Sequence, residues 1–182
     1  MIHGPLVALF KPAIFALLAF NAIIYATAGR AAEGLDALAW FALLVLFEIE
    51  TRYPRWTHQP HNAATLGLLR LVAAAAIAVA ALTFLHEHEW LDATNAWLWI
   101  GVVATLELEV RVPSLVARYR RTVTIVSIVL YAALTAVAVV WLAHGEWFDG
   151  YDAVLWIAAF ALIELGLFKL TMTARAAPGK NI

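Results

Sequence analysis

Residues 36–54 read DALAWFALLVLFEIETRYP, and they decide the fold because the same pattern occurs twice more in the chain. Residues 95–113 read NAWLWIGVVATLELEVRVP, and residues 152–170 read DAVLWIAAFALIELGLFKL. The stretches align without a gap, at offsets of 59 (36 to 95) and 57 residues (95 to 152). All three begin with a polar residue and share one tryptophan and one glutamate position. This regular recurrence predicts an internal structural repeat.

The composition indicates that a lipid bilayer solvates much of the chain. Hydrophobic residues make up 64% of the 182 residues, against roughly 45–50% in average soluble proteins. A helix needs roughly 20 apolar residues to cross the hydrocarbon core. Apolar segments near this length cover residues 12–28, 37–51, 64–85, 96–110, 122–143 and 153–170. We therefore expect an all-α integral membrane protein of six helices.

Each aligned stretch follows another apolar segment and a short acidic turn, so the repeating unit is a helical hairpin. The repeats cover approximately residues 11–54, 70–113 and 121–170 of a single transmembrane domain, 1–182. Three tandem hairpins most simply pack as a six-helix bundle with pseudo-threefold symmetry. Residues 25–28 (YATA) resemble a signal-peptide cleavage site after an apolar stretch. The first apolar segment, 12–28, nevertheless has a place in the repeat. We therefore expect it to stay in the protein as a helix and not to be cleaved as a signal peptide.

Basic residues gather on one side of the predicted bundle. All twelve lysines and arginines except Arg30 lie at matching helix ends, in the connections 52–63 and 111–121, or near the C-terminal end. The other three connections are acidic. Because cytoplasmic loops of membrane proteins are enriched in lysine and arginine, we expect both termini on the cytoplasmic side. The expected location is a cell membrane, most simply a bacterial inner membrane.

Glu48, Glu107 and Glu164 share one repeat position in the inner half of the membrane, and two interpretations compete. As a ring of carboxylates around the axis, they would bind a cation or relay protons. As structural residues, they and their neighbours would form ion pairs. Glu48–Arg52 and Glu107–Arg111 have the helical spacing of four residues. Lys11 and Arg70 are candidate partners for Glu50 and Glu109. The candidate residues for such pairs are Lys11, Glu50, Arg52, Arg70, Glu109 and Arg111.

The third repeat favours the ion-pair interpretation. Gly166 stands where the first repeat has Glu50, and Phe168 stands where it has Arg52, so acid and base are lost together. Glu164 is retained without an obvious local partner. It is therefore the best candidate if one of the three glutamates is functional.

Tryptophans occupy a second repeat position, about two helical turns outward from the glutamates. One interpretation is bulky packing between helices, and the other is the lining of a site for an apolar or quinone-like ligand. Either interpretation applies to all three residues, Trp40, Trp99 and Trp156.

Metals and cofactors have little support in the sequence. His86, His88 and His144 lie among carboxylates in the outer turns, which fits either a divalent metal site or a solvated acidic turn. The chain has no cysteine, which excludes iron–sulfur clusters, and no histidine in a helix middle, which disfavours haem. We expect no cofactor.

The formal net charge of −1 gives no indication of a nucleic-acid partner.

Three classes of function are compatible with this architecture. A transporter or channel needs a polar path, but the helix middles are nearly all apolar. An enzyme needs converging reactive groups, and no nucleophile triad, phosphate loop or zinc-protease pattern occurs. We favour a non-catalytic structural or accessory subunit, whose partners are lipid and other membrane subunits or a second copy. Alanines within residues 73–81 support it, because small residues permit close helix approach. The alternative is a small cation- or proton-linked transporter or channel that uses the glutamates.

Overall fold

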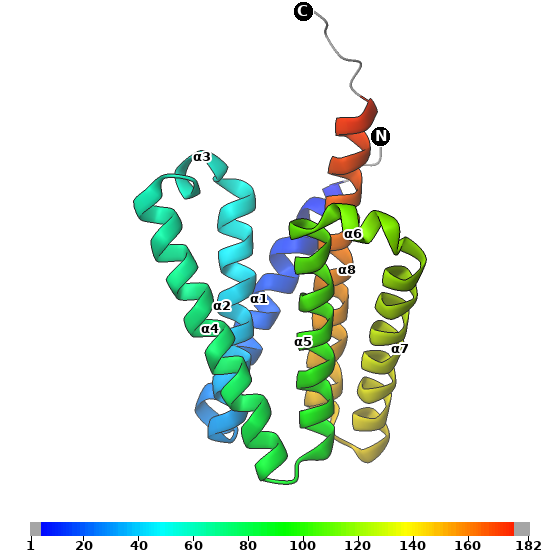
Figure 1. The fold of residues 1–182 in the computed structure, drawn as a ribbon. Coiled ribbons are helices and arrows are strands. Elements are labelled where there is room, and N and C mark those ends of the chain that lie inside the picture. Colours follow the sequence, from blue (N-terminus) through cyan, green and yellow to red (C-terminus); the bar gives the residue numbers. More distant parts are fainter. Residues whose placement is uncertain (1–4, 177–182) are drawn as a thin grey trace, which may run out of the picture.

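The computed structural model describes the backbone of residues 5–176 and the side chains of residues 11–109 and 111–161. Within this region the chain is all-helical, without a strand, as the sequence predicts. The short helices α3 (Pro54–Thr57) and α6 (Pro113–Arg118) lie in two connections at one end of the molecule (Figure 1). The six long helices are α1 (Pro5–Ala28), α2 (Ala31–Arg52), α4 (Pro60–His86), α5 (Trp90–Arg111), α7 (Arg120–His144) and α8 (Trp147–Ala176).

Proline and glycine set several helix ends. Pro54, Pro60 and Pro113 occupy the first positions of α3, α4 and α6, where a missing backbone N–H costs no helical hydrogen bond. Gly145 ends α7 with φ 85°, a left-handed conformation that glycine adopts without steric cost. Pro12, expected at a helix end, lies inside α1 because that helix already begins at Pro5.

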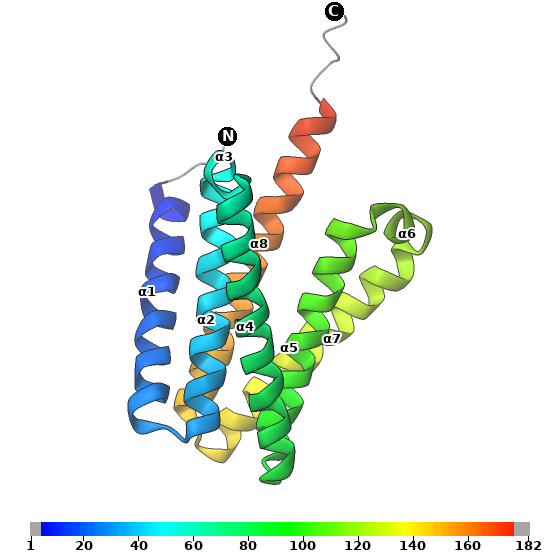
Figure 2. The ribbon, with the colours of Figure 1, turned by 60° about the vertical axis from the view of Figure 1, so that its left-hand side comes forward.

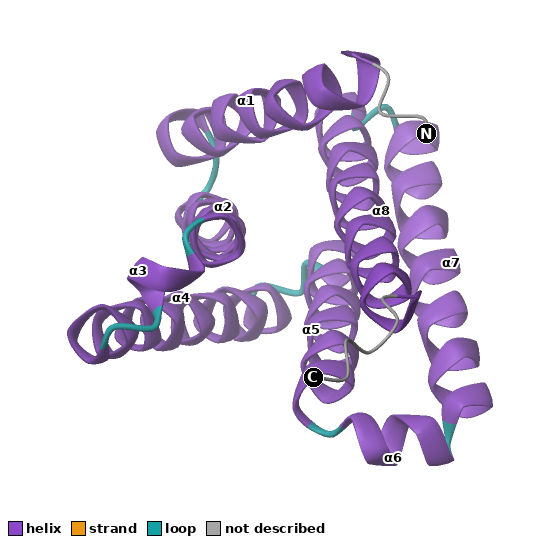
Figure 3. Cartoon of the chain, turned by 90° about the horizontal axis from the view of Figure 1, so that it is seen from above, coloured by secondary structure: helices purple, strands orange, loops and turns teal. Residues whose placement is uncertain are grey.

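The long helices pack in chain order, and the last one returns to the first. α1 contacts α2, α2 contacts α4, α4 contacts α5, α5 contacts α7, α7 contacts α8, and α8 contacts α1. Figure 2 shows the helices running up and down, and Figure 3 looks along them, with α1, α2 and α4 on one side and α5, α7 and α8 on the other. The contact between α8 and α1 therefore closes the chain into a ring of helices.

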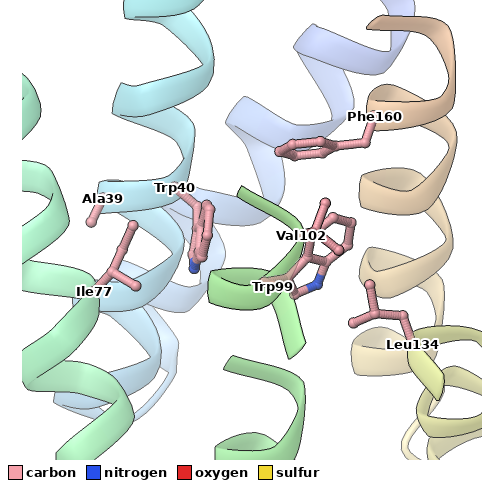
Figure 4. Packing of buried hydrophobic residues seen from close by; sticks show 7 residues of the cluster. All are labelled: Ala39, Trp40, Ile77, Trp99, Val102, Leu134 and Phe160. Carbon is pink, nitrogen blue, oxygen red and sulfur yellow. The ribbon is translucent and has the colours of Figure 1, made fainter. Parts of the chain in front are cut away.

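The centre of this ring is apolar and rich in tryptophan. Ring centroids lie 6.3 Å apart for Trp40 and Trp99, 6.4 Å for Trp40 and Trp156, and 6.4 Å for Trp99 and Trp156. The rings are tilted or edge-on, which are the arrangements that aromatic pairs prefer at such separations. Figure 4 shows two of these tryptophans with the buried side chains around them: Ala39, Trp40, Ile77, Trp99, Val102, Leu134 and Phe160.

In the part of the chain that the structure describes, fewer helices are long and apolar enough to cross a membrane than the six that the sequence predicts. Within the described residues, only three helices are candidate spans: α1 over Lys11–Ala28, α4 and α7. In α2 and α5 the reason is that carboxylates shorten the apolar part of the helix, whereas the side chains of α8 are described only up to residue 161. In α2 only residues 37–47 lie between Asp36 and Glu48, and in α5 only residues 93–106 lie between Asp92 and Glu107. At 1.5 Å per residue, 37–47 span roughly 17 Å of a hydrocarbon core about 30 Å thick.

Candidate functional site

A cavity of about 70 Å³ lies at the acidic end of the ring, among the first turns of α2, α5 and α8. We call it the acidic chamber. Tyr25, Phe84, Asn95, alanines and the indoles of Trp40, Trp99, Trp141 and Trp156 complete its lining. The carboxylates that line it are Glu33, Asp36, Asp92, Asp149 and Asp152. Drug-sized ligands need roughly 300–1,000 Å³, so this chamber fits only a small group or a few waters.

Three chamber residues, Asp36, Asn95 and Asp152, share one position of the proposed repeat. The Trp40 indole donates a hydrogen bond to Asp36 Oδ1 at 3.1 Å, and the Trp156 indole donates to the Asp152 carboxylate. The equivalent position in α5 differs, because Asn95 Oδ1 is buried and has no hydrogen-bond partner. The chamber therefore contains two satisfied acceptors and one unsatisfied acceptor at equivalent places.

Helix α1 supplies polar side chains that reach the α8 wall of the chamber. Asn21 Nδ2 donates to Asp152 Oδ1 at 2.7 Å, and Tyr25 Oη donates to Asp149 Oδ1 at 2.8 Å. Asn21 is only 1% exposed, so an unpaired amide N–H there would be costly. These bonds join the first helix to the last. They therefore help to close the ring as well as to shape the chamber.

Arg30, the exception to the charge asymmetry, links two of the three acidic turns. Its guanidinium lies 2.7 Å from Glu33 and 2.8 Å from Asp92. It also lies 2.6 Å from Glu89 and 3.8 Å from Glu87. One cation thus compensates carboxylates of the α1–α2 and α4–α5 connections. A lone basic residue among acidic turns was the sequence signal for this role.

Three other carboxylates of the chamber lack such compensation. In the described part of the chain, no lysine or arginine forms an ion pair with Asp36, Asp149 or Asp152. Asp36 lies just before the apolar segment 37–51, and Asp152 lies just before the apolar segment 153–170. Burial raises the pKa of Asp36 to about 7 and the pKa of Asp152 to about 6. The chamber can therefore hold protons near neutral pH or attract a cation.

At the opposite, basic end, the structure brings several predicted residues into ion pairs. Lys11 pairs with Glu48, although the helical spacing suggested Arg52 as the partner of Glu48. Arg70 pairs with Glu50, so it binds the preceding hairpin.

The equivalent glutamate of α5 follows the helical spacing. Arg111 pairs with Glu107 one turn earlier in α5, and both side chains are exposed. No ion pair of the described residues includes Arg52 or Glu109. Glu164 lies outside the residues whose side chains are described.

The outer histidines do not converge on a metal-binding arrangement. His86, His88 and His144 are exposed, and the His88 ring lies 5.6 Å from that of Trp90. Among the described residues, no group of three or more histidine, aspartate and glutamate side chains is placed to hold a metal ion.

Comparison of the chain with protein-family models, curated proteins and solved structures found no match. The acidic turns predict topology from the sequence, but their spacing along the chain does not show that they converge in space. The available signal was the alignment of polar positions in all three repeats, with Asp36, Asn95 and Asp152 in one set and Glu33, Asp92 and Asp149 in another.

Replacement of Asp36 by asparagine should stabilise the protein most at high pH. The folded-state pKa of Asp36, about 7, is above its ordinary value, so folding disfavours the ionised form, and the wild type loses stability as pH rises through that pKa. Asparagine still accepts from Trp40 but carries no charge. We expect Asp36→Asn to raise the melting temperature by ~3 °C or more at pH 8. The advantage should shrink toward pH 5.

Thermal unfolding of the purified protein at pH 8, 7, 6 and 5 measures this difference. Glu146→Gln, which removes an exposed carboxylate of the outer α7–α8 connection, is the matched control and should show no such trend. A stabilisation by Asp36→Asn that is the same at every pH would contradict the burial of an ionisable group.

Proposed function

We propose that the chain is a multi-pass integral membrane protein in which three helical hairpins surround a pseudo-threefold axis. Both termini then lie in the cytoplasm, and all six long helices cross the membrane. The near-equal contacts of Trp40, Trp99 and Trp156 support this symmetry, since the tryptophans occupy one repeat position on three hairpins. In this arrangement α2, α5 and α8 tolerate their carboxylates because these lie at the two ends of the ring, away from its apolar centre.

Exposed apolar side chains support a lipid environment. Leu71 of α4 is 65% exposed and Ile128 of α7 is 62% exposed, and both belong to helices that are long and apolar enough to span. Many further large apolar side chains on these two helices are exposed, among them Leu68, Val72, Val79, Leu82, Ile125, Val129 and Val139. Apolar surface of this extent needs lipid or a protein partner to cover it.

We infer that the role is non-catalytic, as a structural or accessory subunit of a larger membrane assembly. The observation that carries this inference is the apolar centre between the two charged ends. Trp99, Val102 and Phe160 pack together there, in contact with Trp40 and Trp156. A channel or transporter needs a polar path through such a centre. A subunit that only supports other helices does not.

Helix α4 offers the face on which another subunit, or a second copy, would pack. Ala73, Ala80 and Ala81 are buried inside the bundle, so part of the alanine-rich stretch serves the chain's own packing. The opposite face exposes Leu71, Ala74, Ala75, Ala78 and Leu82. Small residues on an exposed membrane helix let another helix approach closely, which drives association in lipid through van der Waals contact.

The alternative function is a small cation- or proton-linked transporter or channel that uses Glu48, Glu107 and Glu164. Lys11 and Arg111 already neutralise the first two glutamates, which disfavours a ring of three free carboxylates. Glu164 remains the residue on which this alternative depends.

The proposed topology predicts opposite labelling of the two ends. Because the chain has no cysteine, single cysteines can be introduced at exposed His58, beside α3, and at exposed Glu146, in the α7–α8 connection. Glu146 is preferable to its neighbour Gly145, whose positive φ a cysteine would strain. An impermeant thiol reagent applied to intact cells should label Glu146→Cys and not His58→Cys. The reverse pattern would overturn the orientation.

The accessory role predicts a discrete partner on α4. A photo-reactive benzoylphenylalanine placed at exposed Ala78 should give one cross-linked product of defined size in native membranes, because the partner occupies one position. The same residue at exposed Ala136 of α7 is the matched control and should give none. A product of twice the mass of the chain identifies a second copy as the partner.

Two results would contradict this role. The first is a failure of Ala78 to cross-link to any protein. The second is robust proton or cation flux by the purified protein in proteoliposomes that is lost in Glu164→Gln and kept in Glu48→Gln. That result would establish the transport alternative instead.

A further inference from the structure

We propose that the acidic chamber binds a primary ammonium group, the protonated end of a small amine. The ammonium nitrogen would lie between Asp36, Asn95 and Asp152, next to the tryptophan rings. This inference does not depend on the accessory role, because the chamber belongs to a single chain. It rests on the acceptors, charge, aromatic lining and size of the chamber.

The number of acceptors matches the donors of such a ligand. Asp36, Asn95 and Asp152 all line the chamber, and each comes from the equivalent place of a different hairpin. A primary ammonium group carries three N–H donors and no acceptor. Three acceptors distributed around one axis can each receive one of these donors. Each carboxylate has further acceptor sites besides the one that its indole N–H or the Asn21 amide uses.

An unsatisfied amide oxygen points to a donor ligand independently of the acidic residues. Asn95 lines the chamber, and its Oδ1 is buried and has no hydrogen-bond partner. The Oδ1 of Asn21 is also unpartnered, but Asn21 does not line the chamber, so we infer the donor ligand from Asn95. A buried acceptor left without a donor bears the full cost of its desolvation. A ligand N–H at Asn95 would remove that cost.

The charge of the chamber is negative on the side where the ligand would lie. Arg30 compensates Glu33 and Asp92 at distances of 2.7 and 2.8 Å. Asp36, Asp149 and Asp152 have no such cation among the described residues. The indoles of Trp40, Trp99 and Trp156 supply electron-rich faces, which attract cations in a site shielded from water.

The geometry disfavours a coordinated metal ion as the occupant. In the described region, no group of three or more histidine, aspartate and glutamate side chains is arranged to hold one. The volume of about 70 Å³ accommodates an ammonium group with one or two carbons. A longer amine would extend from the chamber toward the acidic turns.

Binding should weaken as pH falls, because protons compete with the ligand for the carboxylates. The pKa of Asp36 is about 7 and that of Asp152 about 6, so both are mainly ionised at pH 8 and mainly protonated at pH 5. α4 and α7 contribute Phe84 and Trp141 to the chamber, and these do not titrate. The other charged or titratable groups around the chamber are Tyr25, Arg30, Glu33, Asp92 and Asp149.

The test is calorimetric titration of the full chain in lipid nanodiscs with methylammonium at pH 8 and pH 5. We expect saturable binding at pH 8 and affinity lower by roughly ten-fold or more at pH 5. Tetramethylammonium, which has the same charge and no N–H donor, and sodium should bind at least roughly ten-fold more weakly than methylammonium. Asn95→Ala should weaken methylammonium binding by roughly ten-fold or more.

Two variants keep the test interpretable. Asn95→Asp retains an acceptor and adds a negative charge, so it should bind methylammonium as tightly as the wild type or more tightly at pH 8. Glu146→Gln, which lies outside the chamber lining, should bind as the wild type does. The absence of saturable methylammonium binding to the wild type at pH 8 would overturn the proposal. Equal affinity for tetramethylammonium or sodium would overturn the assignment to an ammonium N–H donor.

Discussion

The contact between Trp40, Trp99 and Trp156 is the interaction on which the rest of the structure depends. It joins α2, α5 and α8 at centroid distances of 6.3–6.4 Å, so it fixes where these three helices lie relative to one another. Large aromatic rings at this point fill the centre of the ring and exclude polar groups from it. Among the described residues, charged side chains gather toward the two ends, with the acidic chamber at one and the ion pairs of Lys11, Arg70 and Arg111 at the other.

The same contact ties the centre to the chamber. Trp40 and Trp156 donate to Asp36 and Asp152, one turn closer to the acidic end, so each indole uses its apolar face for packing and its N–H for a buried carboxylate. The equivalent position in α5 is Asn95, whose oxygen lacks a donor. In the proposed repeat, this departure creates a place where a ligand would complete the hydrogen bonding. Arg30 contributes a second asymmetry, because it compensates only part of the acidic lining.

The sequence predicts the helices well, since long apolar segments bounded by proline, glycine and charge leave little choice of secondary structure. It also identifies the repeat positions of the tryptophans, but not whether they contact each other, because that depends on how three helices are rotated about their axes. Local spacing was misleading for Glu48, which pairs with Lys11 of α1 instead of Arg52 one turn away. Local spacing does not predict the chamber either, because its residues come from helices far apart in the sequence. Residues such as Asn21 and Asp152 lie 131 positions apart and meet only when α8 closes onto α1.

A double-mutant cycle on the tryptophans tests the central claim most directly. The melting temperatures and unfolding free energies of Trp40→Leu, Trp99→Leu and the double variant are compared with the wild type, and exposed Trp147 replaces Trp99 in a control cycle. Contact between Trp40 and Trp99 predicts a coupling energy of about 0.5–1.5 kcal/mol, whereas the Trp40–Trp147 cycle should be additive. Strict additivity of Trp40→Leu and Trp99→Leu would contradict the tryptophan contact and the arrangement of helices built around it.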